Sequence, residues 1–155
     1  MGTARDVGTR FAVRIVGPEG RSALLVRVRD GAVLAGQGRR TYRTEAGQEL
    51  VLHQDGTAER RGAVPYGPEW QWVMEASAGF DVEGRSLQEF LDWVSRETGW
   101  RIVLADEGLA ESAAGIVLHG GIGGLRPDQA PFAVLPGAGL EGELEDGTLT
   151  VRPRR

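Results

Sequence analysis

The chain contains no cysteine, which excludes disulfide bonds, thiol nucleophiles, zinc–thiolate sites and iron–sulfur clusters. Lysine and asparagine are also absent, and all 18 basic residues are arginine. A coding bias toward arginine explains this, so the arginine count does not indicate a binding function. No apolar run approaches the roughly 20 residues of a membrane-spanning helix. Residues 1–10 lack the apolar centre of a signal peptide, so we expect a soluble chain without a targeting signal.

Charge is distributed unevenly along the 155 residues. Residues 1–75 carry 11 arginines and 9 acidic residues, whereas residues 76–155 carry 7 and 13. This asymmetry predicts two small domains, 1–75 and 76–155. Neither half has the dense basic stripe with interleaved aromatic residues that binds phosphate backbones, so we expect no nucleic-acid partner.

The first half has the pattern of half-buried strands joined by glycine turns. Residues 9–15 and 24–28 are expected strands, and Arg27 and Arg29 should point outward from the second of them. Three residues of the first strand should face the core: Phe11, Val13 and Ile15.

Two Asp-Gly pairs predict tight hairpin turns. Asp30-Gly31 should return residues 32–35 antiparallel to the preceding strand, and Asp55-Gly56 should join strands at 49–53 and 57–61. Residues 36–40 are expected to form a loop. Residues 62–72 contain several glycines and prolines and are expected to form an irregular connector.

The second half contains the clearest predicted helix. Ser86 with Glu89 three residues later has the spacing of a capping box, and Gly99 suits the residue that ends the helix. One apolar stripe at helical spacing comprises Leu87, Phe90, Leu91 and Val94.

Strands are predicted at 79–83, 100–104 and 113–118, and a hairpin at 141–152 around Asp146-Gly147. A second helix from residue 126 or 127 to 135 should be short or broken, because Pro131 is costly in a helix interior. The fold class is therefore α+β: an N-terminal antiparallel β-meander or β-roll, then a small β-α-β-β-α-β-β module.

Several patterns that resemble functional motifs have simpler explanations. The glycines of residues 137–142 match a dinucleotide fingerprint in letters only, since no strand precedes them and no helix follows. His53 and His119 have no second ligand at metal-binding spacing. The paired carboxylates are best explained as solvated surface; they are Asp81/Glu83, Asp106/Glu107 and Glu143/Glu145.

No serine has a nucleophile-elbow sequence or an identifiable histidine partner. We therefore expect no enzyme and assign no catalytic, cofactor or metal residues. An enzymatic interpretation would require a pocket that joins His119 with a carboxylate. Trp93 and Trp100, which flank the end of the predicted helix, are the candidate partner-binding residues; core packing is the alternative for both.

The second half resembles the short N-terminal domain shared by secretins, TonB-dependent receptors and some FecR-type regulators. Five segments carry the resemblance in order: Phe80-Asp81-Val82, Ser86-Leu87-Gln88-Glu89-Phe90-Leu91, residues 97–104, Gly137-Ala-Gly139-Leu140, and residues 147–151. Prolines at 127, 131 and 136 stand where that family usually has a regular second helix.

The first half resembles the later portion of a FecR-type domain. The matching segments are residues 7–14, Val26-Arg27-Val28 to Asp30-Gly31-Ala32-Val33, and Ala46-Gly47-Gln48-Glu49-Leu50. That family's membrane helix and cytoplasmic anti-sigma part have no counterpart, so we expect a periplasmic segment of a longer parent anchored in the inner membrane.

The resemblance implies a protein–protein interaction module that relays a signal from an outer-membrane receptor toward an inner-membrane anti-sigma regulator. The implied partner is the receptor's signalling domain or another envelope protein. The alternative is an assembly or scaffold module of a secretin-type or cell-envelope complex. Neither function requires a cofactor.

Overall fold

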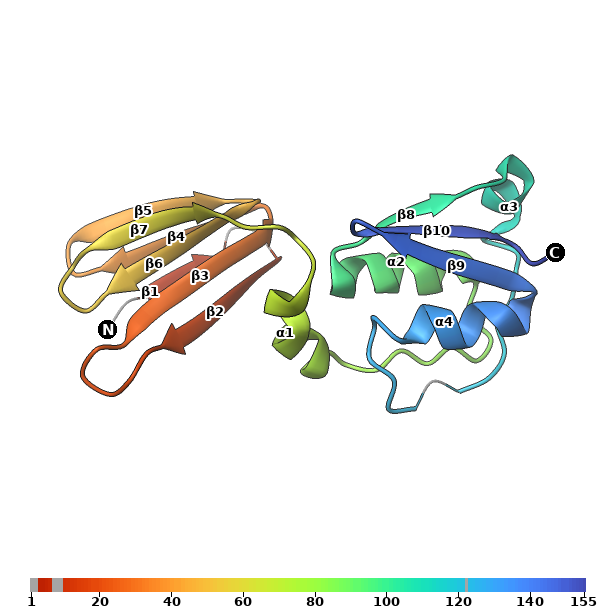
Figure 1. Ribbon diagram of the computed structural model, residues 1–155, viewed down its shortest axis with the longest axis horizontal. Coiled ribbons are helices and arrows are strands. Elements are labelled where there is room, and N and C mark those ends of the chain that lie inside the picture. The colour runs from red at the N-terminus through yellow and green to blue at the C-terminus, as the bar shows by residue number, and fades with distance from the viewer. Residues whose placement is uncertain (1–2, 7–9, 122) are drawn as a thin grey trace. The chain divides into compact units, whose positions relative to one another are not determined.

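The computed structural model describes residues 3–6, 10–121 and 123–155 (Figure 1). The chain forms two compact units, Met1–Pro65 and Tyr66–Arg155. Residues 66–75 therefore belong to the second unit, and with two acidic residues and no arginine they share its acidic character. The predicted α+β class is confirmed: antiparallel sheets come first, followed by a small sheet with helices.

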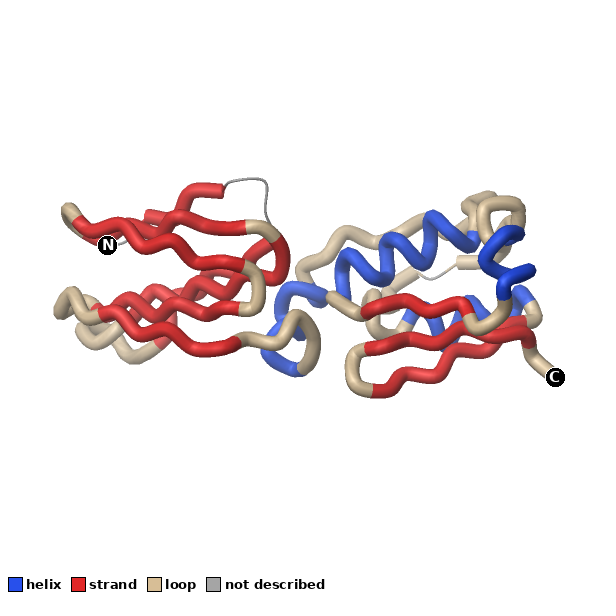
Figure 2. Tube along the Cα trace, turned by 90° about the horizontal axis from the view of Figure 1, so that it is seen from above, coloured by secondary structure: helices blue, strands red, loops and turns tan. Residues whose placement is uncertain are grey.

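The first unit contains two antiparallel sheets. One has the order β1-β4-β5 and the other β2-β3-β6-β7; Figure 2 shows these strands in two layers. Their bounds are β1 Thr3–Asp6, β2 Arg10–Val16, β3 Ala23–Asp30, β4 Ala32–Gln37, β5 Arg40–Glu45, β6 Gln48–His53 and β7 Ala58–Gly62. Thr9, which the sequence pattern placed in β2, lies outside the described residues.

Apolar side chains from both sheets meet in one core. It comprises Val26, Val28, Val33, Ala35, Leu50 and Leu52. Phe11 and Val13 pack against this core as predicted. The prediction for Ile15 is wrong, because Ile15 is 67% exposed. It lies near the end of β2, an edge strand with a neighbour on one side only.

Asp30-Gly31 does not form the predicted hairpin. β3 already pairs with β2 and β6, so neither of its edges is free for β4. The turn instead carries the chain into the other sheet, where β4 pairs with β1 and β5. This crossing buries Val33 and Ala35 in the shared core.

Residues 36–40 are not a loop. β4 continues to Gln37, and a two-residue turn at Gly38-Arg39 leads into β5. β5 went unpredicted because Tyr42 is the only apolar side chain that it contributes to the core. The hairpin at Asp55-Gly56, by contrast, is confirmed, since β6 pairs antiparallel with β7.

Arg27 lies on the sheet face opposite the core, as predicted, yet it is buried. Glu49 lies opposite Arg27 on the neighbouring strand β6 and is buried as well. The Arg27 Nε–H donates to Glu49 Oε2 at 2.8 Å. An arginine can be buried at low cost only when its charge is paired in this way.

The second unit is a three-stranded sheet with helices (Figure 1). β10 is central, parallel to β8 and antiparallel to β9. The elements are the 3₁₀ turn η1 Pro68–Trp70, α1 Gln71–Glu75, α2 Leu87–Thr98, β8 Arg101–Leu104, α3 Glu107–Ser112, α4 Ala130–Val134, the 3₁₀ turn η2 Leu135–Ala138, β9 Leu140–Glu145 and β10 Thr148–Pro153. α2 and α4 cover one face of the sheet (Figure 1) and share its apolar core.

The prediction for α2 is confirmed in detail. Ser86 and Glu89 form both hydrogen bonds of a capping box, and Gly99 ends the helix with a left-handed φ of 77°. The four residues of the predicted apolar stripe are all buried. This helix supplies the framework that positions Trp100 two residues beyond its end.

The predicted strands at 79–83 and 113–118 are not formed. A single bridge joins Ser86 and Val117 instead, and residues 113–115 form a turn directly after α3. The sequence pattern did not indicate α3, whose N-terminus is capped by Asp106. Nor did it indicate η1 and α1 within and after residues 62–72, where Pro68 takes the first helical position.

The second predicted helix is short, as expected. Pro131 lies in the first turn of α4, where its missing N–H would have had no helical acceptor. The final hairpin is also confirmed. Asp146 and Gly147 both adopt positive φ, 45° and 72°, as the turn between β9 and β10 requires.

Candidate functional site: a pocket around Trp100

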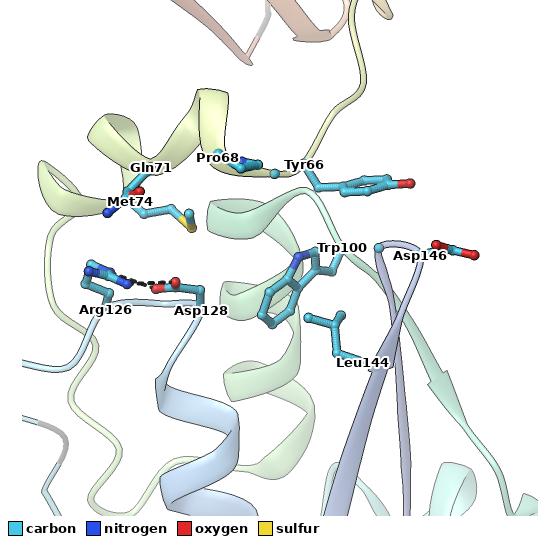
Figure 3. Close-up of a pocket in the computed structure, with 11 residues that line it drawn as sticks. Tyr66, Pro68, Gln71, Met74, Trp100, Arg126, Asp128, Leu144 and Asp146 are labelled. Atoms are coloured by element: carbon cyan, nitrogen blue, oxygen red, sulfur yellow. Dashed lines mark hydrogen bonds and ion pairs between the residues drawn. The ribbon is translucent and has the colours of Figure 1, made fainter.

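The second unit contains a pocket of about 450 Å³. Its lining residues are Tyr66, Gly67, Pro68, Gln71, Met74, Trp100, Arg126, Asp128, Leu144, Asp146 and Gly147 (Figure 3). They come from four parts of the chain: residues 66–74, Trp100 just after the cap of α2, the segment before α4, and the β9–β10 hairpin. Trp100 lies in the middle of them (Figure 3).

Main-chain hydrogen bonds hold Trp100 in place. Its N–H donates to Thr98 Oγ1 at 3.0 Å, and its carbonyl accepts from Ser95 Oγ at 2.8 Å. The ring meets Phe132 edge-on with centroids 6.5 Å apart. These contacts fix the indole before any ligand arrives.

The Trp100 indole N–H forms no hydrogen bond with the described residues, and it is not among their fully buried polar atoms that lack a partner. Figure 3 shows its nitrogen on the side of Pro68 and Met74. Water can therefore reach this N–H and accept its hydrogen bond until a ligand enters the pocket. The pocket therefore presents one unused donor among apolar walls.

The Tyr66 ring forms one wall and packs against the hairpin turn at Gly147. Leu144 adds apolar surface from β9, and Met74 adds it from α1. The pocket thus has an aromatic and aliphatic lining, as binding pockets for apolar groups commonly do.

Three charged groups border the pocket. Arg126 forms two hydrogen bonds with Asp128, both 3.0 Å long. These bonds raise the pKa of Arg126, first through the hydrogen bonding itself and then through the opposite charge. The Asp146 carboxylate points away from Trp100 (Figure 3). Since Arg126 and Asp128 neutralise each other, Asp146 leaves this border acidic.

Trp93, the other predicted partner-binding residue, does not line this pocket. It is 3% exposed and stacks on Phe80, with ring centroids 5.2 Å apart. A residue that anchors a partner must be exposed, and Trp93 is not. It does border a second, smaller cavity of about 280 Å³ together with Phe80 and residues 123–127.

His119 does meet a carboxylate. Its Nδ1 lies 2.9 Å from Glu83 Oε1, and the Gly120 N–H donates to Glu83 Oε2 at 2.9 Å. The Gly120 bond, followed by the His119 bond, lowers the pKa of Glu83. Both side chains are well exposed, and neither borders the Trp100 pocket. The pair ties residues 119–120 to residue 83 at the surface.

Among the described residues, no group of three or more histidine, aspartate or glutamate side chains is arranged to hold a metal ion. No helix in the described ranges is long and apolar enough to cross a membrane.

His53, the last residue of β6, lies beside Glu59, with 3.3 Å between His53 Nε2 and Glu59 Oε1.

The sequence indicated Trp100 but not the residues around it. Tyr66, Met74 and Arg126 have no periodic pattern, and the pocket forms only when their segments meet. One local signal was available: the Asp146-Gly147 pair predicted a turn, and such a glycine permits a close approach by another side chain.

No protein-family model matches this chain, and no curated protein matches it. Among solved structures, two crystal structures of a candidate anti-sigma factor from Parabacteroides distasonis resemble it. In the one at 2.50 Å resolution, the match has a TM-score of 0.41 and 12% identity and covers 92% of this chain and 64% of the other. In the one at 1.65 Å resolution, the match has a TM-score of 0.38 and 13% identity and covers 98% of this chain and 68% of the other. The chain thus spans about two thirds of the length of these proteins.

Proposed function

We propose that this chain is the periplasmic recognition segment of a signalling protein. It binds the signalling domain of an outer-membrane receptor and passes that state toward an anti-sigma regulator at the inner membrane. The observation that carries the proposal is the Trp100 pocket, an apolar recess with an unused hydrogen-bond donor. Pockets of this kind receive anchor side chains at protein interfaces.

The resemblance to FecR-type and secretin-type modules supports the same direction. Three elements that carry it in the second half are formed: α2, β8 and the β9–β10 hairpin. The Trp100 pocket lies where the end of α2 meets the turn of that hairpin. The chemistry proposed is recognition alone, without catalytic, cofactor or metal residues.

Direct binding tests the proposal. The full chain is immobilised, and the signalling domain of the receptor encoded beside its gene is applied at up to high micromolar concentration. Saturable binding is expected. The control is the signalling domain of an unrelated receptor, which should bind at least tenfold more weakly. Absence of binding at high micromolar concentration would contradict the relay.

An assembly or scaffold role is the second candidate. Leu144 on the edge strand β9 and Phe132 on α4 are large apolar residues exposed in the second unit, and exposed apolar residues favour self-association when they form a patch. Light scattering separates the two roles. A mass that rises with chain concentration, without receptor binding, would favour assembly.

A further inference from the structure

We infer that the Trp100 pocket is a socket for one apolar side chain of a basic segment in the partner protein. The main-chain carbonyl of that segment accepts the Trp100 indole N–H. This inference rests on the proposed function, because it names the partner's chemistry at the same site.

The walls select an apolar side chain. Tyr66, Met74, Trp100 and Leu144 contribute rings, a thioether and a branched aliphatic group. The nearest charged side chains, Arg126 and Asp128, satisfy each other through two hydrogen bonds. A charged side chain in the pocket would lose its water without gaining a free counter-charge. The inserted side chain should therefore be apolar, such as that of leucine, methionine or phenylalanine.

The Trp100 indole N–H favours a ligand that brings a main-chain carbonyl as its acceptor. The Trp100 indole N–H forms no hydrogen bond with the described residues, and it is not among their fully buried polar atoms that lack a partner, so water reaches it. A ligand that covers this N–H displaces water from it, and a carbonyl that enters with the side chain supplies the acceptor that replaces that water. A peptide supplies both groups together, because every side chain is flanked by main-chain carbonyls.

The charge around the pocket selects a basic segment. The second unit, residues 66–155, has seven arginines against fifteen acidic residues. At the border of the pocket, the Asp146 carboxylate points outward, away from the apolar walls (Figure 3). An arginine or lysine next to the inserted side chain would therefore lie near Asp146 and within an acidic field.

The socket is formed in advance. Tyr66 packs on Gly147, and the Trp100 backbone is fixed by Ser95 and Thr98. Preformed walls reduce the ordering cost of binding. A short peptide should therefore bind measurably.

The test uses the full ¹⁵N-labelled chain and three capped hexapeptides. The first is Gly-Ser-Leu-Arg-Ser-Gly; the second replaces its leucine by serine, and the third replaces its arginine by glutamate. The reporter is the indole ¹H–¹⁵N signal of Trp100, assigned with Trp100→Phe. The first peptide should shift this signal saturably. Loss of the leucine should weaken binding about tenfold or more.

Four variants refine the test. Gln71→Trp fills the pocket from α1 and Leu144→Ser removes a wall, so both should abolish the shift. Asp146→Asn keeps a residue that tolerates positive φ and should weaken binding of the arginine peptide up to about fivefold. Glu111→Gln removes one negative charge from α3 outside the pocket and should change nothing.

The outcomes separate the inference from the proposed function. If Trp100 does not respond up to millimolar peptide, or responds equally to the serine peptide, the socket is refuted. If the receptor domain binds the wild-type chain and Gln71→Trp equally, the relay stands and the socket is wrong. If the peptide binds as expected but no receptor domain does, the socket stands and the relay is wrong.

Discussion

The ring of Tyr66 packs so closely on Gly147 that a β-carbon added to this glycine would overlap Cε1 of the ring. The same glycine adopts a φ of 72°. The two residues are far apart in sequence, and their contact joins the start of the second unit to its last hairpin. It also forms one wall of the Trp100 pocket.

Gly147→Ala should therefore destabilise the second unit by about 2–4 kcal/mol. Positive φ alone costs about 1–2 kcal/mol, and displacement of Tyr66 adds to it. All four tryptophans lie in the second unit, so tryptophan fluorescence during urea unfolding follows this unit selectively.

Gly139→Ala is the matched control for that variant. Gly139 also has a positive φ, 71°, but nothing lies within 4 Å of the position that an added β-carbon would take. It should cost only about 1–2 kcal/mol. Equal losses for the two variants would mean that the Tyr66 contact has no energetic weight.

Ser86→Ala should destabilise the second unit by about 1 kcal/mol. The Ser86 hydroxyl accepts from the Glu89 N–H at 3.2 Å, and the Ser86 N–H donates to Glu89 Oε2 at 2.9 Å. Ser112→Ala, near the end of α3, is the control and should cost less. A loss below about 0.3 kcal/mol for Ser86→Ala would show that the capping box contributes little.

The stability of the second unit should fall at acidic pH. The pKa values of Glu83 and Glu89 are lowered, chiefly by main-chain hydrogen bonds from Gly120 and Ser86. A lowered folded-state pKa gives stability that is complete above the ordinary value of 4.5 and is lost as the pH falls through the folded-state pKa. Urea midpoints between pH 7 and pH 3 measure this.

Glu83→Gln should flatten that pH dependence, because the variant has no titrating carboxyl at residue 83. Glu111→Gln, with an exposed side chain on α3, is the control and should keep the wild-type slope. If Glu83→Gln retained the full slope, the hydrogen bonds to residues 119 and 120 would not be the cause.

Glu49→Leu should destabilise the first unit by about 3–5 kcal/mol, since it removes the carboxylate that the buried Arg27 contacts. The double variant Arg27→Met/Glu49→Leu should recover most of this loss. Hydrogen exchange of β3 and β6 peptides measures it. Glu45→Gln, which removes the charge from an exposed pair with Arg43, should cost at most about 1 kcal/mol.

Local patterns predicted the elements whose causes are local. The capping box, the apolar stripe of α2, Gly99 and the last hairpin all depend on residues close in sequence, and all are confirmed. Arg27 shows the limit of such reasoning. Its alternation with Val26 and Val28 placed it on the correct face, but only the β3–β6 pairing with Glu49 explains its burial.

Tertiary contacts decided the remaining elements. Asp30-Gly31 has the letters of a hairpin turn, yet both edges of β3 were occupied by β2 and β6, which sent β4 to the other sheet. The pocket was predictable only at Trp100. Its other walls come from residues 66–74, 126–128 and 144–147, whose meeting no short-range pattern encodes.

We propose that the chain recognises a partner protein through the Trp100 pocket. The most direct measurement is isothermal titration of the full chain with the receptor's signalling domain, comparing wild type with Trp100→Phe and the Glu111→Gln control. We predict at least tenfold weaker binding for Trp100→Phe, with the control and urea-unfolding cooperativity unchanged. Equal affinity for all three chains would contradict the account.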